Sequence, residues 1–316
     1  MDEELKNICE LLVRNYEEMK AAEADKKVEF MAAGAGVFTA DDVLIDIDRL
    51  EAAKAVIDKK DGFFDDYRSR AAFIVLCKLA VAEDPDAYFE QLMETCMALQ
   101  TGKLYTESNN ILSSIILLDG LGEENFEHCE DVAERSKGIF RLISEGSKGI
   151  PSDMPFAVIA AVNGREPEDM FNDEKAAKNY IKKAITVDNV TSPSMAKCIA
   201  LTDGDVIEKC SRVCDIVMAL KKAKCSTGQG RVNILLSLAS YLDLDHDEMV
   251  SEIVAADSIL KKYKPFKGLT GVEPEFRRLM AILCVMIRYD QTGGALARHG
   301  AIMAVYITLL NATRAF

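Results

Sequence analysis

The chain has 316 residues, of which 49% are hydrophobic and 28% charged, a composition typical of a globular protein with a buried core. Its formal net charge of −14 argues against broad binding to a nucleic-acid backbone, because such binding depends on many surface lysines and arginines. No apolar run reaches the roughly 20 residues that a membrane-spanning helix needs. The start, Met1-Asp2-Glu3-Glu4, lacks the basic and apolar regions of a secretory signal. We therefore expect a cytoplasmic protein with no membrane partner.

Charge and cysteine content add two expectations. Residues 1–150 carry 32 acidic and 17 basic side chains, whereas residues 151–316 carry 20 and 21, so the negative charge lies in the first half. An acidic half favours either a basic partner or simple solubility. The nine cysteines are odd in number and irregularly spaced, and most lie within apolar helical patterns, as Cys77, Cys198 and Cys284 do. This pattern predicts free buried thiols in a reducing compartment.

Helical spacing of apolar residues dominates the chain, and no stretch alternates as a strand would. A weak first pair of helices is predicted at 3–23 and 27–38. Longer amphipathic helices follow, and a closing helix is predicted at 295–312. The amphipathic helices are expected at 43–59, 86–99, 124–144, 173–187, 205–223 and 247–263.

A recurring segment separates these amphipathic helices. In it, Gly, Asn or Lys leads to an apolar or small residue, then to Ser, Thr or Asp, and then to a strongly apolar helix. The segments begin at Gly62, Gly102, Gly149, Asn189, Lys224 and Gly268, with spacings of 40, 47, 40, 35 and 44 residues. The polar residues expected to cap the apolar helices are Asp65, Thr106, Ser152, Ser192, Ser226 and Thr270. Each repeat is therefore predicted to be an amphipathic helix A followed by an apolar helix B.

Repeats of this length with two helices each are typical of HEAT and armadillo arrays, in which neighbouring repeats bury each other's apolar faces. We expect an all-α, curved α-α superhelix of six or seven stacked helix pairs with no sheet, in one domain spanning 1–316. The alternative is an irregular helical bundle with evenly spaced loops. The expected units are a weak pair at 1–40, repeats at 41–84, 85–122, 123–164, 165–203, 204–243 and 244–290, and a closing helix at 291–316.

Three segments of the chain resemble the bacterial domain of unknown function 4003 family. They are KVEFMAAGAGVFTADDVLID at 27–46, GFFDDYRSRAAFIVLCKLA at 62–80 and GIPSDMPFAVIAAV at 149–162. The family often carries a tryptophan before the early helix, and this chain has none. Because the family has no established activity, the resemblance implies no catalytic residue.

Aspartates near the first repeat invite comparison with magnesium sites of helical terpenoid synthases, which bind a diphosphate. They are Asp41, Asp42, Asp46, Asp65 and Asp66. Asn233 and Ser237 resemble part of a second such motif, but Tyr241 stands where a metal-binding Glu belongs. Helix capping explains the aspartates adequately. A magnesium-dependent enzyme acting on a diphosphate remains an alternative, and we assign no catalytic residue, cofactor site or metal ligand.

Two further groups of residues allow other kinds of site. Cys210 and Cys214 lie one helical turn apart and Cys225 follows in the next loop, so a metal site is conceivable, although packing thiols explain them better. Basic pairs recur once per repeat in the second half, where they could form a stripe that binds an acidic peptide or nucleic acid, or simply end the A helices. These pairs are Lys182-Lys183, Lys221-Lys222, Lys261-Lys262 and Arg277-Arg278.

The sequence favours a non-enzymatic scaffold that binds a protein or peptide, and leaves the oligomeric state open. Arg68 and Asn109 follow their predicted caps by three residues in consecutive repeats, so stacking should place them on one edge. Arg and Tyr are enriched among interface hot spots. The alternative is that the arginines pair with nearby acids. The candidate contact edge consists of Tyr67, Arg68, Arg70, Tyr105, Asn109 and Asn110.

Overall fold

The computed structural model describes residues 3–22, 27–59, 70–100, 107–144, 153–228, 230–267, 271–292 and 294–312. These residues form α-helices, short 3₁₀ turns and loops and contain no strand, which confirms the predicted all-α class. The α-helices are α1 (Glu3–Ala22), α2 (Val28–Ala40), α3 (Ile47–Lys59), α4 (Arg70–Val81), α5 (Pro85–Ala98), α6 (Glu107–Leu121), α7 (Cys129–Ile143), α8 (Met154–Val162), α9 (Pro167–Ala184), α10 (Thr191–Ile199), α11 (Val206–Lys222), α12 (Val232–Ala239), α13 (His246–Leu260), α14 (Pro274–Tyr289) and α15 (Ala295–Ala312). Two 3₁₀ turns are η2 (Glu123–His128) and η4 (Lys264–Phe266).

The helices α1 to α14 alternate between two kinds of burial. The odd-numbered A helices bury one face; in α9 the buried residues are Met170, Glu174, Ala177 and Ile181. The even-numbered B helices are buried on nearly every side, and all eight residues of α12 are buried. The B helices therefore form an inner layer that the A helices cover. Within the part of the chain that the structure describes, no helix has both the length and the apolar character that crossing a membrane requires.

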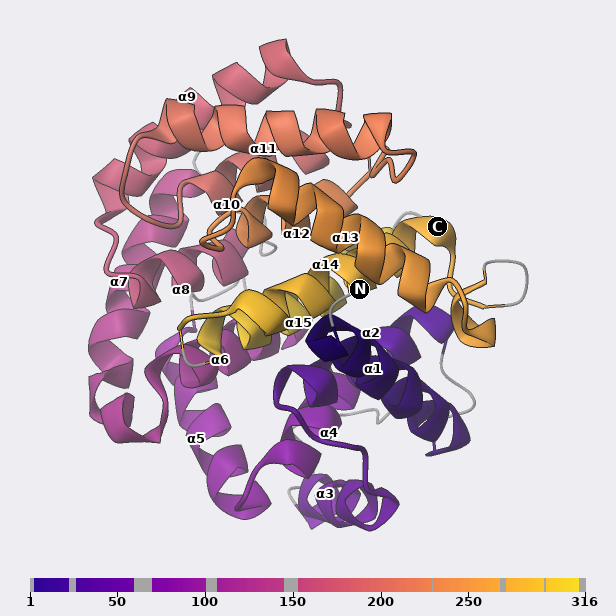
Figure 1. The fold of residues 1–316 in the computed structure, drawn as a ribbon. Helices are drawn as coiled ribbons and strands as arrows, with labels where there is room; N and C mark the ends of the chain where they lie inside the picture. Colours follow the sequence, from indigo (N-terminus) through magenta and orange to yellow (C-terminus); the bar gives the residue numbers. More distant parts are fainter. Residues whose placement is uncertain are drawn as a thin grey trace.

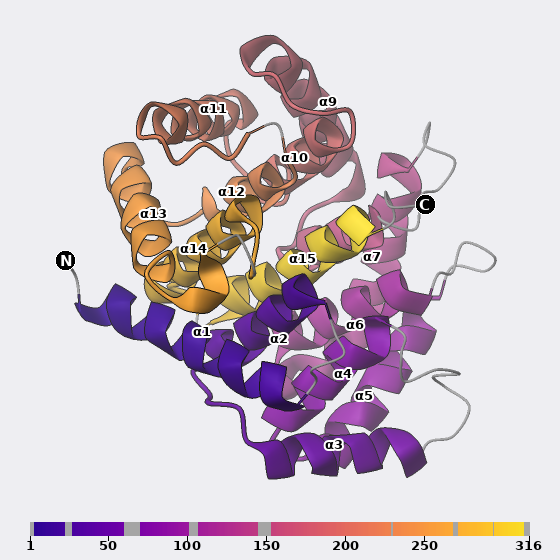
Figure 2. The ribbon, with the colours of Figure 1, turned by 90° about the vertical axis from the view of Figure 1, so that its right-hand side faces the viewer.

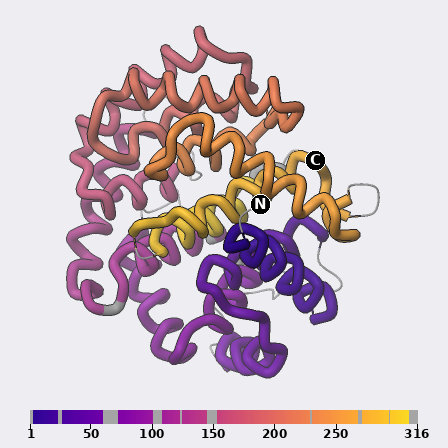
Figure 3. Tube along the Cα trace, in the orientation of Figure 1, coloured from indigo at the N-terminus to yellow at the C-terminus, as the bar shows by residue number. Residues whose placement is uncertain are grey.

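The helix pairs form a closed ring. A helices pack side by side from α3 through α5, α7, α9 and α11 to α13, and α1 packs against both α13 and α14. The inner helix α2 also contacts α14. Figures 1 and 3 show this meeting of the chain's ends, with the indigo first helix beside the orange and gold ones. The open curved superhelix expected from the repeats is not confirmed, because the last pair returns to the first.

Specific side chains join the first and last helix pairs, and this junction is called the seam below. The rings of Tyr16 on α1 and Phe266 in η4 lie 5.5 Å apart between centroids. The hydroxyl group of Tyr263 donates a hydrogen bond of 2.9 Å to the carboxylate of Glu10. Both contacts join the N-terminal helix to the segment that follows α13, so the seam combines apolar packing with a charge-assisted hydrogen bond.

The closing helix α15 lies inside the ring rather than at its end. It contacts the inner helices α2, α6, α12 and α14, and Figure 2 shows it passing through the middle of them. Every residue from Ala301 to Thr308 is buried. At Gly300 a Cβ atom would lie 2.6 Å from the Met286 side chain, so glycine permits the close approach of α15 to α14. The ring of Tyr306 meets that of Phe156 on α8 edge to face at 5.6 Å.

Two predicted caps of the B helices are wrong. Ser192 lies within α10, and the amides of Val190 and Thr191 instead donate to the carboxylate of Asp188, at 2.9 and 2.8 Å. Ser226 accepts a hydrogen bond from the amide of Gly228, several residues before α12 begins. The helix α10 begins one residue before Ser192, whereas α12 begins six residues after Ser226. The other four predicted caps lie outside the described residues.

The helix α15 fills the centre of the ring, and its small buried residues are closely packed. Ala304 is fully buried there. We predict that Ala304→Leu lowers the free energy of unfolding by about 1–3 kcal/mol, because extra methyl groups in a packed core force neighbouring side chains out of place. Ala55→Leu on the exposed face of α3 is the control and should change stability by less than about 0.5 kcal/mol. Denaturant unfolding measures both, and an unchanged Ala304→Leu variant would show that the centre is loosely packed.

His299 on α15 should make stability depend on pH. Its Nε2 atom lies 3.0 Å from the carbonyl oxygen of Ile116, to which the neutral ring donates, and burial lowers its pKa below 6.5 despite the nearby Asp119. The unfolded chain therefore binds the proton more readily than the folded one. Stability should be complete above about pH 6.5 and fall at lower pH, by up to about 1.4 kcal/mol per pH unit.

The variant His299→Gln tests this assignment. Glutamine can still donate to the carbonyl group of Ile116 but does not titrate. We expect the difference in unfolding free energy between the parent and the variant to shrink as the pH falls from 7.5 to 5.5. Equal slopes for the two proteins would show that His299 is not the titrating group.

Candidate functional site

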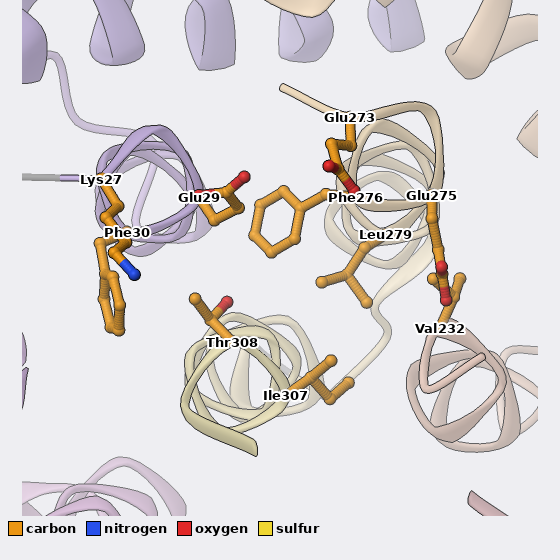
Figure 4. A pocket seen from close by; sticks show the side chains of 10 residues that line it. All are labelled: Lys27, Glu29, Phe30, Val232, Glu273, Glu275, Phe276, Leu279, Ile307 and Thr308. Atoms are coloured by element: carbon orange, nitrogen blue, oxygen red, sulfur yellow. The ribbon is translucent and has the colours of Figure 1, made fainter. Parts of the chain in front are cut away.

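A cavity of about 340 Å³ opens at the end of the ring where B helices begin. It lies between the starts of α2, α12 and α14 and the final turns of α15, as Figure 4 shows. The lining residues are Lys27, Glu29, Phe30, Val232, Glu273, Glu275, Phe276, Leu279, Ile307 and Thr308. This set is called the ring-end pocket below.

The ring-end pocket exists because the ring closes. Lys27 and Glu29 stand at the start of α2, and Glu273 immediately precedes α14. Thr308 lies near the C-terminal end of α15, because α15 runs antiparallel to α2 and α14. Residues some 240 positions apart in the sequence thus face one another across the seam.

The floor of the ring-end pocket is apolar. Phe30, Phe276 and Leu279 are buried, and Val232 on α12 and Ile307 on α15 add aliphatic surface. Figure 4 shows the Phe276 ring near the middle of the pocket, between α14 and the side chain of Glu29. Such a floor favours a ligand group with an apolar surface.

Carboxylates surround this floor. Three carboxylates, Glu29, Glu273 and Glu275, and one cation, Lys27, are among the lining residues. Partial burial raises the pKa of the Glu275 carboxyl group. The carboxylates of Glu273 and Asp188 raise it further, whereas Arg278 and Arg231 oppose the rise. A carboxylate in this setting is stabilised by a cation placed next to it.

Gly230 has no side chain and so leaves room for the carboxylate of Glu275. A Cβ atom added at Gly230 would collide with the carboxylate of Glu275, so this carboxylate lies directly against the backbone of the loop before α12. In Figure 4 the Glu275 side chain runs toward Val232 on α12. A larger residue at 230 would therefore displace the carboxylate of Glu275 from its present position.

The basic pairs of the second half divide into two groups. The three lysine pairs are exposed at or just after the ends of α9, α11 and α13, which are neighbours in the ring. Arg277 is buried instead, where it forms an ion pair of 2.8 Å with Asp257, and Arg278 donates to the carbonyl oxygen of Ser226 at 2.6 Å. The exposed group, Lys182, Lys183, Lys221, Lys222, Lys261 and Lys262, is called the lysine rim below.

Of the candidate contact edge, the structure describes only part. Tyr67, Arg68 and Tyr105 lie outside the described residues, as does the side chain of Arg70, the first residue of α4. Asn110 is buried, and its side-chain amide donates to the carbonyl oxygen of Cys96 at 3.0 Å, so it ties α6 to α5. Asn109 is half-buried.

Asn233 and Ser237, which the sequence compares with part of a magnesium site, form hydrogen bonds within the protein. The side chain of Asn233 accepts a hydrogen bond from Thr227 at 2.6 Å and donates to the carbonyl oxygen of Gly230 at 3.1 Å. Ser237 donates to the backbone of Asn233 at 2.8 Å. These bonds fix the loop before α12. Among the described residues, no three His, Cys, Asp or Glu side chains are grouped as a metal site would need.

All nine cysteines are buried and free, as the sequence predicted. Burial raises the pKa of Cys210 to about 12 and that of Cys214 to about 11. Burial also raises the pKa of Cys225. Burial of all three thiols fits the packing role that the sequence favours for them.

Sequence reasoning did not select the four charged residues of the ring-end pocket. One local signal was present, because Glu273-Pro274-Glu275 places two carboxylates around the first residue of a helix. That pattern also fits ordinary helix starts, where acidic residues favour the helix dipole. Only the closed ring shows that these carboxylates line the same pocket as Glu29 and Lys27.

Comparison with known proteins places the chain in a family without assigning it an activity. No curated protein and no solved structure shows a detectable match to it. The family model described as protein of unknown function (DUF4003) matches residues 15–313, which is nearly the whole chain and includes the ring-end pocket. The chain belongs to the DUF4003 family.

Proposed function

We propose that the protein is a non-enzymatic interaction scaffold and that the ring-end pocket binds a segment of a partner protein. The segment carries a lysine or arginine beside an apolar side chain. The observation behind this proposal is the pocket itself, in which three carboxylates and one lysine surround an apolar floor.

The two parts of the pocket recognise two parts of this segment. An apolar side chain enters the pocket beside Phe30 and Phe276 and displaces water from this apolar floor, as apolar anchors do in interface hot spots. A neighbouring basic group then reaches Glu273 and Glu275, and its charge compensates the two carboxylates. The same arrangement disfavours an acidic segment, since like charges would face one another.

A second candidate function rests on the lysine rim. Six exposed lysines at the ends of three neighbouring helices could hold an acidic segment of a partner. Their position at helix ends is also favourable for each helix on its own, because cations stabilise the carboxyl end. A cytoplasmic location suits either function, because nine free thiols stay reduced there.

The magnesium-dependent diphosphate enzyme remains a separate alternative. Thermal unfolding with magnesium and inorganic diphosphate distinguishes it from a scaffold, because a ligand that binds only the folded state raises the melting temperature. A clear rise would contradict the scaffold. The native partner can be isolated by affinity capture from the source organism, followed by mass spectrometry.

Substitution of the pocket carboxylates tests the main proposal. We predict that Glu273→Gln/Glu275→Gln weakens binding of a fluorescent basic and apolar peptide by about threefold to tenfold, since partly exposed ion pairs contribute up to about 1 kcal/mol each. Glu17→Gln/Glu18→Gln, which changes two exposed carboxylates on α1, is the charge-matched control. Fluorescence anisotropy measures both variants. Equal binding by the pocket variant and the parent, or binding of acidic peptides only, would contradict the proposal and favour the lysine rim.

Binding should also depend on pH through Glu275. Its pKa is raised from 4.5, so the carboxylate that attracts the peptide forms only as the pH rises through this higher value. We predict tighter binding at pH 7 than at pH 5, measured with a peptide whose basic group is arginine, which keeps its charge throughout. In Glu275→Gln the pH dependence should become smaller. An identical pH profile in the variant would show that another group titrates.

A further inference from the structure

A second cavity, of about 210 Å³, lies at the opposite end of the ring. It is formed where the B helices α2, α4 and α6 end and where α15 begins, and α5 and η2 cover its side. It shares no lining residue with the ring-end pocket. Its volume is below that of pockets for drug-sized ligands, which indicates a smaller occupant.

Two cations and two carboxylates line this cavity. Lys78 on α4 contacts Asp119 on α6 at 2.9 Å and Asp41 after α2 at 3.5 Å. The side chains of Lys78 and Asp119 are only 5% and 7% exposed. Arg298 on α15 lies 3.9 Å from the other oxygen of Asp41. The two positive and two negative charges cancel, so a ligand with a net charge would leave one charge uncompensated in this buried site.

Two polar atoms at this cavity have no hydrogen-bond partner among the described residues. They are the hydroxyl group of Tyr88 on α5 and the Oδ2 atom of Asp119, and both atoms are buried. Burial raises the pKa of Tyr88 well above 10, as do the carboxylates of Asp119 and Asp41, so the hydroxyl group keeps its proton and can donate. One donor and one charged acceptor without partners thus lie in residues that line the cavity.

We propose that this cavity binds a small zwitterion of the α-amino-acid type. The ammonium group of the ligand donates to Oδ2 of Asp119, and its carboxylate accepts from the hydroxyl group of Tyr88 and faces Arg298. A neutral zwitterion satisfies both unused atoms and leaves the four charges balanced. Leu118 and Phe126 provide an apolar wall for a short side chain.

Isothermal titration calorimetry of the full chain with single amino acids tests this proposal. Propylamine, propionate and glycerol serve as probes that carry only the cation, only the anion or only hydroxyl groups. We expect at least one amino acid with a small apolar side chain to bind saturably and to raise the melting temperature, and each probe to bind at least tenfold more weakly. If no amino acid binds, or if a probe binds equally well, the proposal is wrong.

Tyr88→Phe separates binding from folding. If the hydroxyl group lacks a partner in the free protein, its removal leaves the melting temperature unchanged or higher. Affinity for the amino acid should nevertheless fall at least tenfold, as it should in Asp119→Asn. Tyr180→Phe, at a partly buried tyrosine on α9, is the matched control and should bind as the parent does. Parental affinity in Tyr88→Phe, or a lower melting temperature of its ligand-free form, would overturn the proposal.

Discussion

The packing of α15 inside the ring is the constraint on which the rest of the structure depends. Seven pairs of helices leave apolar faces directed at the centre, and α15 covers those of α2, α6, α12 and α14. Small residues make this possible, because Gly300, Ala301 and Ala304 allow close approach on a helix that is buried along two turns. Without α15 the inner layer would face water, so the ring and its central helix stabilise each other.

The two cavities described above follow from this arrangement, because α15 fills the middle of the ring and each cavity lies at one end of α15. At the end where B helices begin, Glu29 and Glu275 occupy first turns, where the positive pole of each helix favours a carboxylate. At the other end, Lys78 lies in the last turn of α4, where the negative pole favours a cation. Asp41 and Asp119 also lie at the carboxyl ends of their helices, where the dipole disfavours them, and their ion pairs with Lys78 compensate for it.

The alternation of A and B helices could be predicted because it depends on local patterns of apolar residues. The capping predictions were weaker, and Ser192 and Ser226 failed because a serine near a helix start does not reveal how long the preceding loop is. Closure of the ring could not be predicted. It depends on a small rotation between successive pairs, and on contacts such as Tyr263 with Glu10, which join residues 253 positions apart.

The predicted contact edge and the ring-end pocket both lie at starts of B helices, but they consist of different residues. The predicted contact edge lay at the starts of two successive B helices, α4 and α6, since consecutive repeats are the only neighbours that a linear pattern reveals. The ring-end pocket also lies at starts of B helices, but it joins α2 to α12 and α14 across the seam and adds the end of α15. A closed ring makes the first and last repeats neighbours, so the residues most distant in the sequence can share a site. In such a protein the seam is the region where a single sequence is least informative and where the structure adds most.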